Sequence, residues 1–300
     1  MNIGLIDVDS HNFPNLCLMK ISAYHKGRGD NVEWWNGLKH YDLVYKSKVF
    51  DETYTNDVDY CIMADKVICG GTGYDLKNKL PDEIEHQYPD YGLYRGGASR
   101  AYGHLTRGCP RKCKFCIVSE KEGNTHTVAE LSEFWRGQKE IMLMDSNITA
   151  SKDCERHFDS LIASGAWINF EGGLDIRFMT EKGADQLNRM KISMIHFAWD
   201  NYEFDTYDKL KRIRPLLKAD DRHIRVYVLT NFNSTHEQDI EKIYKLKEIG
   251  CDPFVMIYDK PNAPKQTKAL QRWCNNKWIF RACEKFEDYE GGMKRCLKNY

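Results

Sequence analysis

The chain has 300 residues, of which 42% are hydrophobic, and its 44 Lys and Arg balance its 44 Asp and Glu. This length suffices for one large or two smaller domains, and the neutral charge gives no global field that would indicate a nucleic-acid partner. No apolar stretch reaches the roughly 18 to 20 residues that span a bilayer. We expect a cytoplasmic protein without a membrane partner, in a reducing compartment where its eleven cysteines persist as thiols or metal thiolates.

The first 95 residues carry the pattern of a small Rossmann-like α/β domain. Apolar runs predict four strands, and an apolar face at helical spacing predicts a helix after the first strand. The strands are expected at residues 2–9, 32–35, 42–50 and 66–69, with the helix between Asn12 and Gly29. A stretch with Pro and Gly, ending at Gly97, predicts a linker and places the domain boundary near residue 95.

From Arg100 onward, strand and helix patterns alternate in six successive units. Strands are expected at 101–105, 140–144, 167–170, 195–199, 224–229 and 253–258, and helices at 128–138, 154–164, 181–190, 205–217 and 237–249. Parallel strands need crossover connections, which are usually helices, so we expect a partial (βα)6 barrel of the TIM type over residues 96–275. Functional groups should lie on loops at the carboxyl ends of its strands, and residues 276–300 should form a tail that packs on the barrel.

Three cysteines follow the first predicted barrel strand at the spacing C-x3-C-x2-C, namely Cys109, Cys113 and Cys116. Iron-sulfur clusters are held by cysteine thiolates, normally four for a cubane cluster, so three would leave one iron without a protein ligand. An open metal position is typical of catalytic rather than structural centres. The segment from Arg107 to Lys114 also carries four cations, which favour deprotonated thiolates.

With Phe115 directly before the last cysteine, this loop resembles the C-x3-C-x-aromatic-C signature of the radical S-adenosylmethionine (SAM) superfamily. The resemblance covers residues 98–275 and implies the same partial barrel. It further implies a 4Fe-4S cluster on the three cysteines, chelation of SAM by the open iron, and a position for Phe115 near the adenine. A reductant such as a flavodoxin or ferredoxin would supply one electron, and SAM cleavage would start hydrogen abstraction from an unidentified substrate.

Polar residues after the second barrel strand are candidates for binding SAM. Asp145, Ser146 and Asn147 stand where many members of the superfamily carry a Gly-Gly-Glu stretch that binds the amino group of SAM. The stretch here more closely resembles an acidic-Asn-aromatic-Thr version found in cobalamin-linked and related branches. An N-terminal cap for the following helix is the alternative interpretation.

The later strand ends supply further candidates for cofactor or substrate contacts. Glu171, Asp175 and Arg177 follow the third strand beside two glycines, and charges at such a place are costly unless they are paired or bind a ligand. Arg177 is the expected partner of the cofactor's carboxylate, with an internal Asp175–Arg177 salt bridge as the alternative. The remaining candidates are Asp200 after the fourth strand and Thr230 with Asn231 after the fifth.

The first domain contains two weaker motifs. Asp9-Ser10-His11 resembles the lower-ligand loop of cobalamin-binding domains, but Pro14 replaces their glycine and the domain is small. Cobalamin is therefore the less favoured interpretation, and we expect an accessory domain that contributes substrate contacts or covers the barrel mouth. Gly70-Gly71-Thr72-Gly73 could approach a phosphate, yet it lacks the spacing of a dinucleotide fingerprint.

Two other classes of function stay open. The missing Gly-Gly-Glu stretch is compatible with a non-catalytic metal-binding or redox module that keeps the fold. Zinc in the purified protein, instead of iron and sulfide, would indicate such a module. An RNA-modifying enzyme, either methylthiotransferase-like or a methyltransferase, is the third hypothesis, for which the neutral charge gives little support. A zinc site on the loop would need a fourth ligand, and neither His104 nor His126 stands at a standard spacing.

Overall fold

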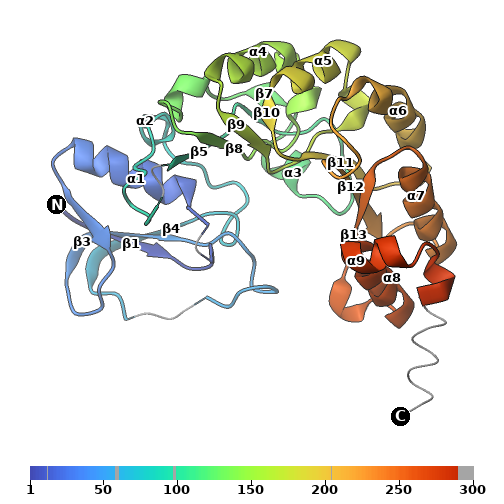
Figure 1. Ribbon diagram of the computed structural model, residues 1–300. Helices are drawn as coiled ribbons and strands as arrows, with labels where there is room; N and C mark the ends of the chain where they lie inside the picture. Colours follow the sequence, from blue (N-terminus) through green and yellow to red (C-terminus); the bar gives the residue numbers. More distant parts are fainter. Residues whose placement is uncertain (12, 58–60, 97–98, 204, 290–300) are drawn as a thin grey trace. The chain divides into compact units, whose positions relative to one another are not determined.

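The computed structural model describes residues 1–11, 13–57, 61–96, 99–203 and 205–289. The chain packs into two compact units, Met1–Ser146 and Asn147–Tyr300, and each contains parallel β-strands (Figure 1). The predicted α/β class is therefore confirmed. The domain boundaries near residues 95 and 275 stay predictions, and the predicted linker at Gly97 and part of the predicted tail lie outside the described residues.

The first unit begins with a four-stranded parallel sheet in the order β2-β1-β3-β4. Its strands are β1 (Asn2–Asp7), β2 (Asn31–Trp34), β3 (Tyr41–Ser47) and β4 (Ala64–Gly70), and helix α1 (Leu16–Gly27) lies against one face (Figure 1). Apolar residues of α1, the short helix α2 (Asp82–Glu85) and the strands form one core cluster, which includes Ile3, Leu5, Leu18, Ile21, Leu43 and Ile84. All four strands and α1 occur where the sequence predicts them.

The order of these strands reverses between β1 and β3, because β2 follows β1 on one side and β3 follows on the other. Asn15 caps the start of α1, where its side-chain oxygen accepts a hydrogen bond from the Leu18 N–H at 3.2 Å. In open parallel sheets, ligands bind outside the carboxyl ends of strands at such a reversal point. The loops after β1 and β3 therefore occupy the edge of this sheet that general topology associates with binding.

The rest of the first unit pairs β5 (Arg100–Gly103) with β8 (Glu140–Leu143) in parallel. The connection between them holds β6 (Thr106–Arg107), helix α3 (Val118–Lys121), β7 (His126–Thr127) and the 3-10 turn η2 (Leu131–Glu133). β6 and β7 pair antiparallel. The sequence predicted neither this antiparallel pair nor α3.

The helix predicted for residues 128–138 is wrong, because the only helical structure there is the single turn η2. Gly137 has a φ of +93°, which an α-helix does not allow, and the Trp135 indole N–H donates to the Gln138 carbonyl at 2.9 Å. Leu131 and Phe134 are buried, so their spacing serves the core without a continuous helix. The segment between β7 and β8 is therefore built from turns.

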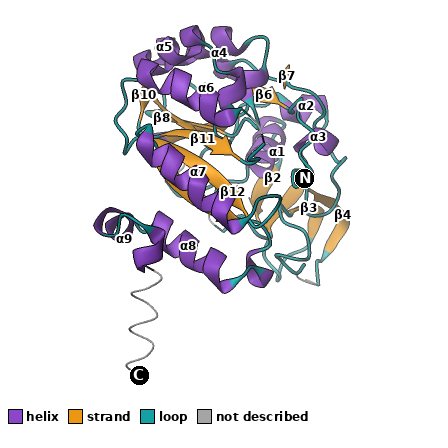
Figure 2. Ribbon diagram, turned by 90° about the vertical axis from the view of Figure 1, so that its right-hand side faces the viewer, coloured by secondary structure: helices purple, strands orange, loops and turns teal. Residues whose placement is uncertain are grey.

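The second unit contains the remaining strands and helices, arranged mostly as predicted (Figure 2). Its strands are β9 (Trp167–Phe170), β10 (Lys191–Ile192), β11 (Ile195–Trp199), β12 (Ile224–Thr230) and β13 (Asp252–Ile257). Its helices are α4 (Cys154–Ser164), α5 (Glu181–Arg189), α6 (Thr206–Ile213), α7 (His236–Glu248), α8 (Lys265–Asn275) and α9 (Lys277–Ala282), with 3-10 turns η3 (Ile148–Ala150), η4 (Ile176–Phe178), η5 (Arg214–Leu216) and η6 (Lys260–Asn262).

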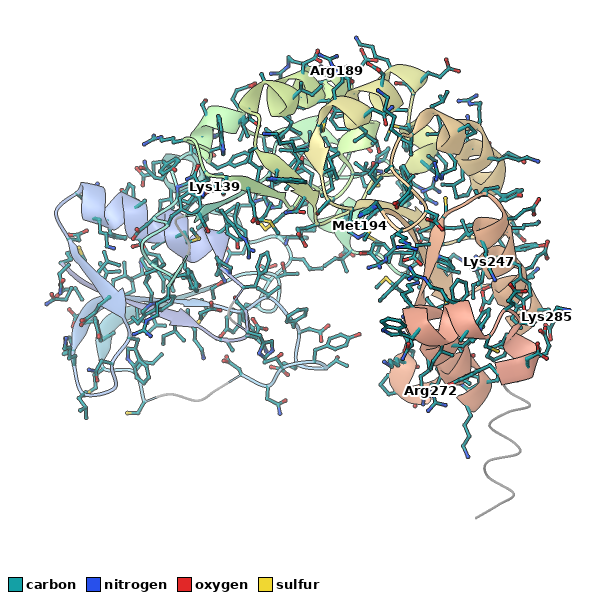
Figure 3. All side chains as sticks on the ribbon, viewed as in Figure 1. Lys139, Arg189, Met194, Lys247, Arg272 and Lys285 are labelled. Carbon is teal, nitrogen blue, oxygen red and sulfur yellow. The ribbon has the colours of Figure 1, made fainter. Side chains whose placement is uncertain are left out.

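Strands β11, β12 and β13 form one parallel sheet, and β9 pairs in parallel with β10. A single bridge between Leu174 and Phe197 joins these two groups. Helices α4 to α7 lie on one side of the strands, with charged side chains such as Arg189 and Lys247 on their outer surface (Figures 1 and 3). A continuous six-stranded partial barrel stays a prediction.

The core of the second unit continues beyond the last strand. Helix α8 packs on β13, where the Asn275 side-chain oxygen accepts a hydrogen bond from the Val255 N–H at 2.8 Å. Trp273 of α8 is fully buried and contacts the ring of Phe280 in α9. Across the described ranges, no helix combines enough length with enough apolar character to cross a membrane.

Candidate active site

The cysteine loop leaves β6 through a glycine whose conformation other residues avoid. Gly108 has a φ of +85°, and a Cβ at this position would lie 2.4 Å from the Asn124 carbonyl oxygen. The Cys109 N–H donates to the Gly123 carbonyl at 2.9 Å, and the β6–β7 pair closes the base of the loop below these residues. The two ends of the loop are thus held side by side.

The three cysteines lie on this closed loop with different exposure. Cys109 and Cys113 are partly buried, Cys116 is exposed, and the Cys116 N–H donates to the Cys113 carbonyl at 3.0 Å in a tight turn. In the described part of the chain no cysteine forms a disulfide, and no three His, Cys, Asp or Glu side chains gather as ligands of one metal ion. A cubane cluster takes one thiolate per iron, so three thiols on a partly exposed loop fit it in donor chemistry and access.

Glu122, which the sequence prediction missed, anchors the start of the cysteine loop through hydrogen bonds. Its carboxylate accepts hydrogen bonds from the Gly108 N–H at 2.9 Å, from Arg107 Nη1 at 3.1 Å and from the Ser146 hydroxyl at 3.1 Å. Burial raises the pKa of Glu122, but the Gly108 N–H and the Arg107 guanidinium outweigh it, and the pKa lies below its ordinary value. The only sequence signal was an acidic residue shortly after a cationic loop.

Both ends of the loop also contact the N-terminal sheet region of the same unit. Arg107 Nη2 lies 3.6 Å from the carboxylate of Glu85 in α2, which also pairs with Lys20 of α1 at 2.9 Å. At the other end, the Lys121 ammonium donates to the Thr72 hydroxyl at 2.5 Å, in the glycine-containing loop after β4. The cysteine loop is therefore tied to α1, α2 and the β4 loop.

Asp145 and Ser146, predicted as cofactor contacts, both support the cysteine loop. The buried Asp145 carboxylate accepts hydrogen bonds from the Leu105 N–H at 3.2 Å, the Thr106 N–H at 2.5 Å and the Thr106 hydroxyl at 2.7 Å. Burial raises the pKa of Asp145 to about 6, against the effect of these donors. These bonds join the end of β8 to the start of the loop, and contact of Asp145 with SAM stays a prediction.

The second unit brings three of the other predicted residues together. Asp175 and Arg177 form the two-pronged salt bridge that the sequence left as an alternative, with Arg177 Nε and Nη2 at 2.6 and 2.7 Å from the carboxylate. Asn147 donates to the same carboxylate at 3.3 Å and also caps η3 by accepting from the Ala150 N–H. Thr149 Oγ1 accepts the Asp175 N–H at 3.0 Å, a contact that the site prediction missed.

The other predicted residues of this unit make separate contacts. Glu171 is exposed beyond β9. Thr230 is fully buried and donates to the Met256 carbonyl at 3.3 Å, and Asn231, with a φ of +61°, donates to the Tyr258 carbonyl at 2.9 Å. Thr230 and Asn231 thus fasten the end of β12 to the end of β13.

The Asp200 carboxylate interacts electrostatically with Lys242, a buried lysine that the sequence prediction missed. Lys242 pairs with Asp239 at 2.9 Å and donates to the Leu229 carbonyl at 2.7 Å. Burial lowers the pKa of Lys242, and the carboxylates of Asp239 and Asp200 oppose that shift.

Comparison with known proteins bears on the fold of the chain. No protein-family model and no curated protein matches the sequence. Two solved structures of the radical SAM methyltransferase TsrM from Kitasatospora setae are similar at 11% sequence identity. One, with cobalamin and a 4Fe-4S cluster bound, gives a TM-score of 0.64 over 85% of this chain and 74% of the TsrM chain. The other, with tryptophan substrate and the SAM analogue aza-SAM bound, gives 0.62 over 85% and 72%. The chain therefore shares the fold of TsrM, which confirms at the level of fold the resemblance predicted from its cysteine loop.

Proposed function

We propose that this chain is a radical SAM enzyme that holds a 4Fe-4S cluster on Cys109, Cys113 and Cys116. The observation that supports the proposal is the loop itself. It carries three thiols, the β6–β7 pair holds its two ends together, and it lies in a chain with this fold. When bound, such a cluster supplies the electron that cleaves SAM. The reaction we favour is hydrogen abstraction from a substrate that is not yet identified, in a reducing cytoplasm, with a flavodoxin or ferredoxin as electron donor.

Several side chains are proposed to bind and orient SAM. The cations from Arg107 to Lys114 would offset the negative charge of a thiolate-ligated cluster, and Phe115 is the proposed contact for the adenine. Arg177 is the proposed partner of the SAM carboxylate. To bind it, Arg177 would give up one of its two hydrogen bonds to Asp175. Asn147 is the proposed contact for the amino group.

Further proposed contacts lie at the ends of the later strands. Contacts to cofactor or substrate are proposed for Glu171, Asp200 and Asn231, each of which is at least partly exposed. Thr230 is fully buried, so its proposed part is to hold the end of β12, and with it Asn231, in place.

Anaerobic reconstitution with iron and sulfide tests the proposal directly. Wild-type protein should hold about four iron and four sulfide per chain, and with reductant and SAM it should release 5'-deoxyadenosine. Cys113→Ala should lose the cluster, whereas the control Cys61→Ala, an exposed cysteine in a loop before β4, should keep it. One zinc per chain without SAM binding would instead support the metal-binding module, and an intact cluster that releases no 5'-deoxyadenosine would reject catalysis by SAM cleavage.

A cobalamin-dependent methyl transfer is the second candidate, favoured by the N-terminal sheet. TsrM, whose fold this chain shares, has been solved with cobalamin bound. In the present chain, Lys48 follows β3 at the point where the strand order reverses, is 1% exposed, and places its ammonium 5.8 Å from the centre of the Tyr74 ring. A buried ammonium there is suited to the phosphate of cobalamin. The backbone of Val49 and Phe50 beyond it is held by the Asp9 carboxylate at 2.8 Å.

Titration with hydroxocobalamin, followed by absorbance, tests this second candidate. Wild-type protein should bind it, and Lys48→Met with an unchanged circular dichroism spectrum should bind roughly 10-fold more weakly. The exposed Lys66→Met on β4 should bind like the wild type. Release of S-adenosylhomocysteine would indicate methyl transfer, and absence of cobalamin binding would reject this candidate without affecting the cluster proposal.

A further inference from the structure

The cysteine loop depends on one carboxylate that binds two segments distant from it in sequence. The side chain of Glu122 is 10% exposed, and the donors to it come from Arg107 at the end of β6, Gly108 at the start of the loop and Ser146 after β8. These donors lie 15, 14 and 24 residues away along the chain. A charge-assisted bond to each is stronger than a neutral one, so loss of the carboxylate would release all three together.

The Gly108 bond bears most directly on ligation, because Gly108 precedes Cys109. Its N–H belongs to the Arg107–Gly108 peptide plane, the plane just before the one that enters Cys109, and Glu122 fixes its direction by accepting this bond at 2.9 Å. The next N–H, that of Cys109, is already committed to the Gly123 carbonyl at 2.9 Å. Together the two bonds set how the first thiol is presented, as groups around a metal site orient its direct ligands.

We propose that Glu122 is a positioning residue of the cluster, acting through Gly108 and Arg107 rather than by contact with iron or substrate. This inference rests on the proposed cluster at Cys109, Cys113 and Cys116. The carboxylate has a second effect, because an anion near a cluster disfavours the additional electron of the reduced state. Glu122 therefore contributes both to how firmly the cluster is held and to its reduction potential.

Glu122→Gln tests the inference, with Glu120→Gln as the matched control on the exposed side of α3. Reconstituted Glu122→Gln should lose iron to a chelator roughly 10-fold faster than the wild type. Its reduction potential should become more positive, because a negative charge has been removed. Glu120→Gln should match the wild type in both measurements, and circular dichroism reports whether each variant is folded.

A second variant keeps the test decisive if Glu122→Gln does not fold. Ser146→Ala removes one donor to the carboxylate and should speed iron loss in the same direction by a smaller factor. Iron loss and potential equal to the wild type in the folded variants would overturn the inference. A wild-type protein that binds no cluster would instead reject the proposed function, so the two failures are distinguishable.

Discussion

Replacement of Asp145 by Asn should change how the stability of the protein depends on pH. Burial raises the pKa of this carboxyl to about 6, compared with about 3.9 for an aspartate in an unfolded chain. The folded protein therefore binds the proton more tightly than the unfolded chain does. The stability that comes from this difference is complete below about pH 4 and is lost as the pH rises through 6.

The size of the effect follows from the difference between the two pKa values. A gap of about two pKa units corresponds to roughly 3 kcal/mol, which the wild type loses between about pH 4 and pH 7 and which Asp145→Asn, having no proton to release, does not lose. At pH 4 the variant should be less stable by about 1–3 kcal/mol, because its amide N–H2 faces the buried Leu105 N–H and leaves it without an acceptor. At pH 7 the two proteins should be nearly equal, or the variant more stable.

Urea unfolding followed by tryptophan fluorescence, at several pH values between 4 and 7.5, measures this difference. The unfolding free energy of the wild type relative to the variant should fall steadily as the pH rises. A difference that stays constant over this range, or that grows with pH, would refute the reasoning.

Two further predictions concern packing and buried charge. Gly103→Ala would place a Cβ 2.3 Å from the ring of Phe134 and should lower the free energy of unfolding by about 1–3 kcal/mol, whereas Gly27→Ala, with no atom within 4 Å, should not lower it. Lys242→Met leaves a buried carboxylate on the same helix without its 2.9 Å partner and should cost roughly 3–5 kcal/mol, against less than about 1 kcal/mol for Lys245→Met in a surface pair. Urea unfolding checks both, and a harmless Gly103→Ala or equal losses for the two lysine variants would contradict them.

Most strands and helices were predictable because each has a local signal. Strand β11 and helix α4 have the predicted bounds, since an apolar run and a regular apolar face respectively define them. The helix expected at 128–138 had a similar apolar spacing, yet turns formed there. The competing contacts of Trp135 and the left-handed Gly137 depend on packing that periodicity does not report.

The candidate site divides in the same way between local and distant signals. Cys109, Cys113 and Cys116 were found because ligand spacing is a property of one short segment. The Asp175–Arg177 bridge was anticipated as an alternative, since the partners are two residues apart. Glu122 was missed because its role depends on donors from segments that only the folded chain brings together.

The turns between β7 and β8 should exchange their backbone hydrogens with solvent differently from a helix. The Phe134 carbonyl accepts from the Tyr91 hydroxyl at 2.7 Å, and the Arg136 N–H donates to the Gln138 side chain at 2.7 Å. Helical amides are protected as a group, whereas the amides of these turns, held by isolated backbone bonds such as that of Trp135 to Leu131 or by one side chain, open one at a time. Deuterium should therefore enter residues 128–138 sooner than it enters α4, so the segment that follows the cysteine loop would open without unfolding of the sheet.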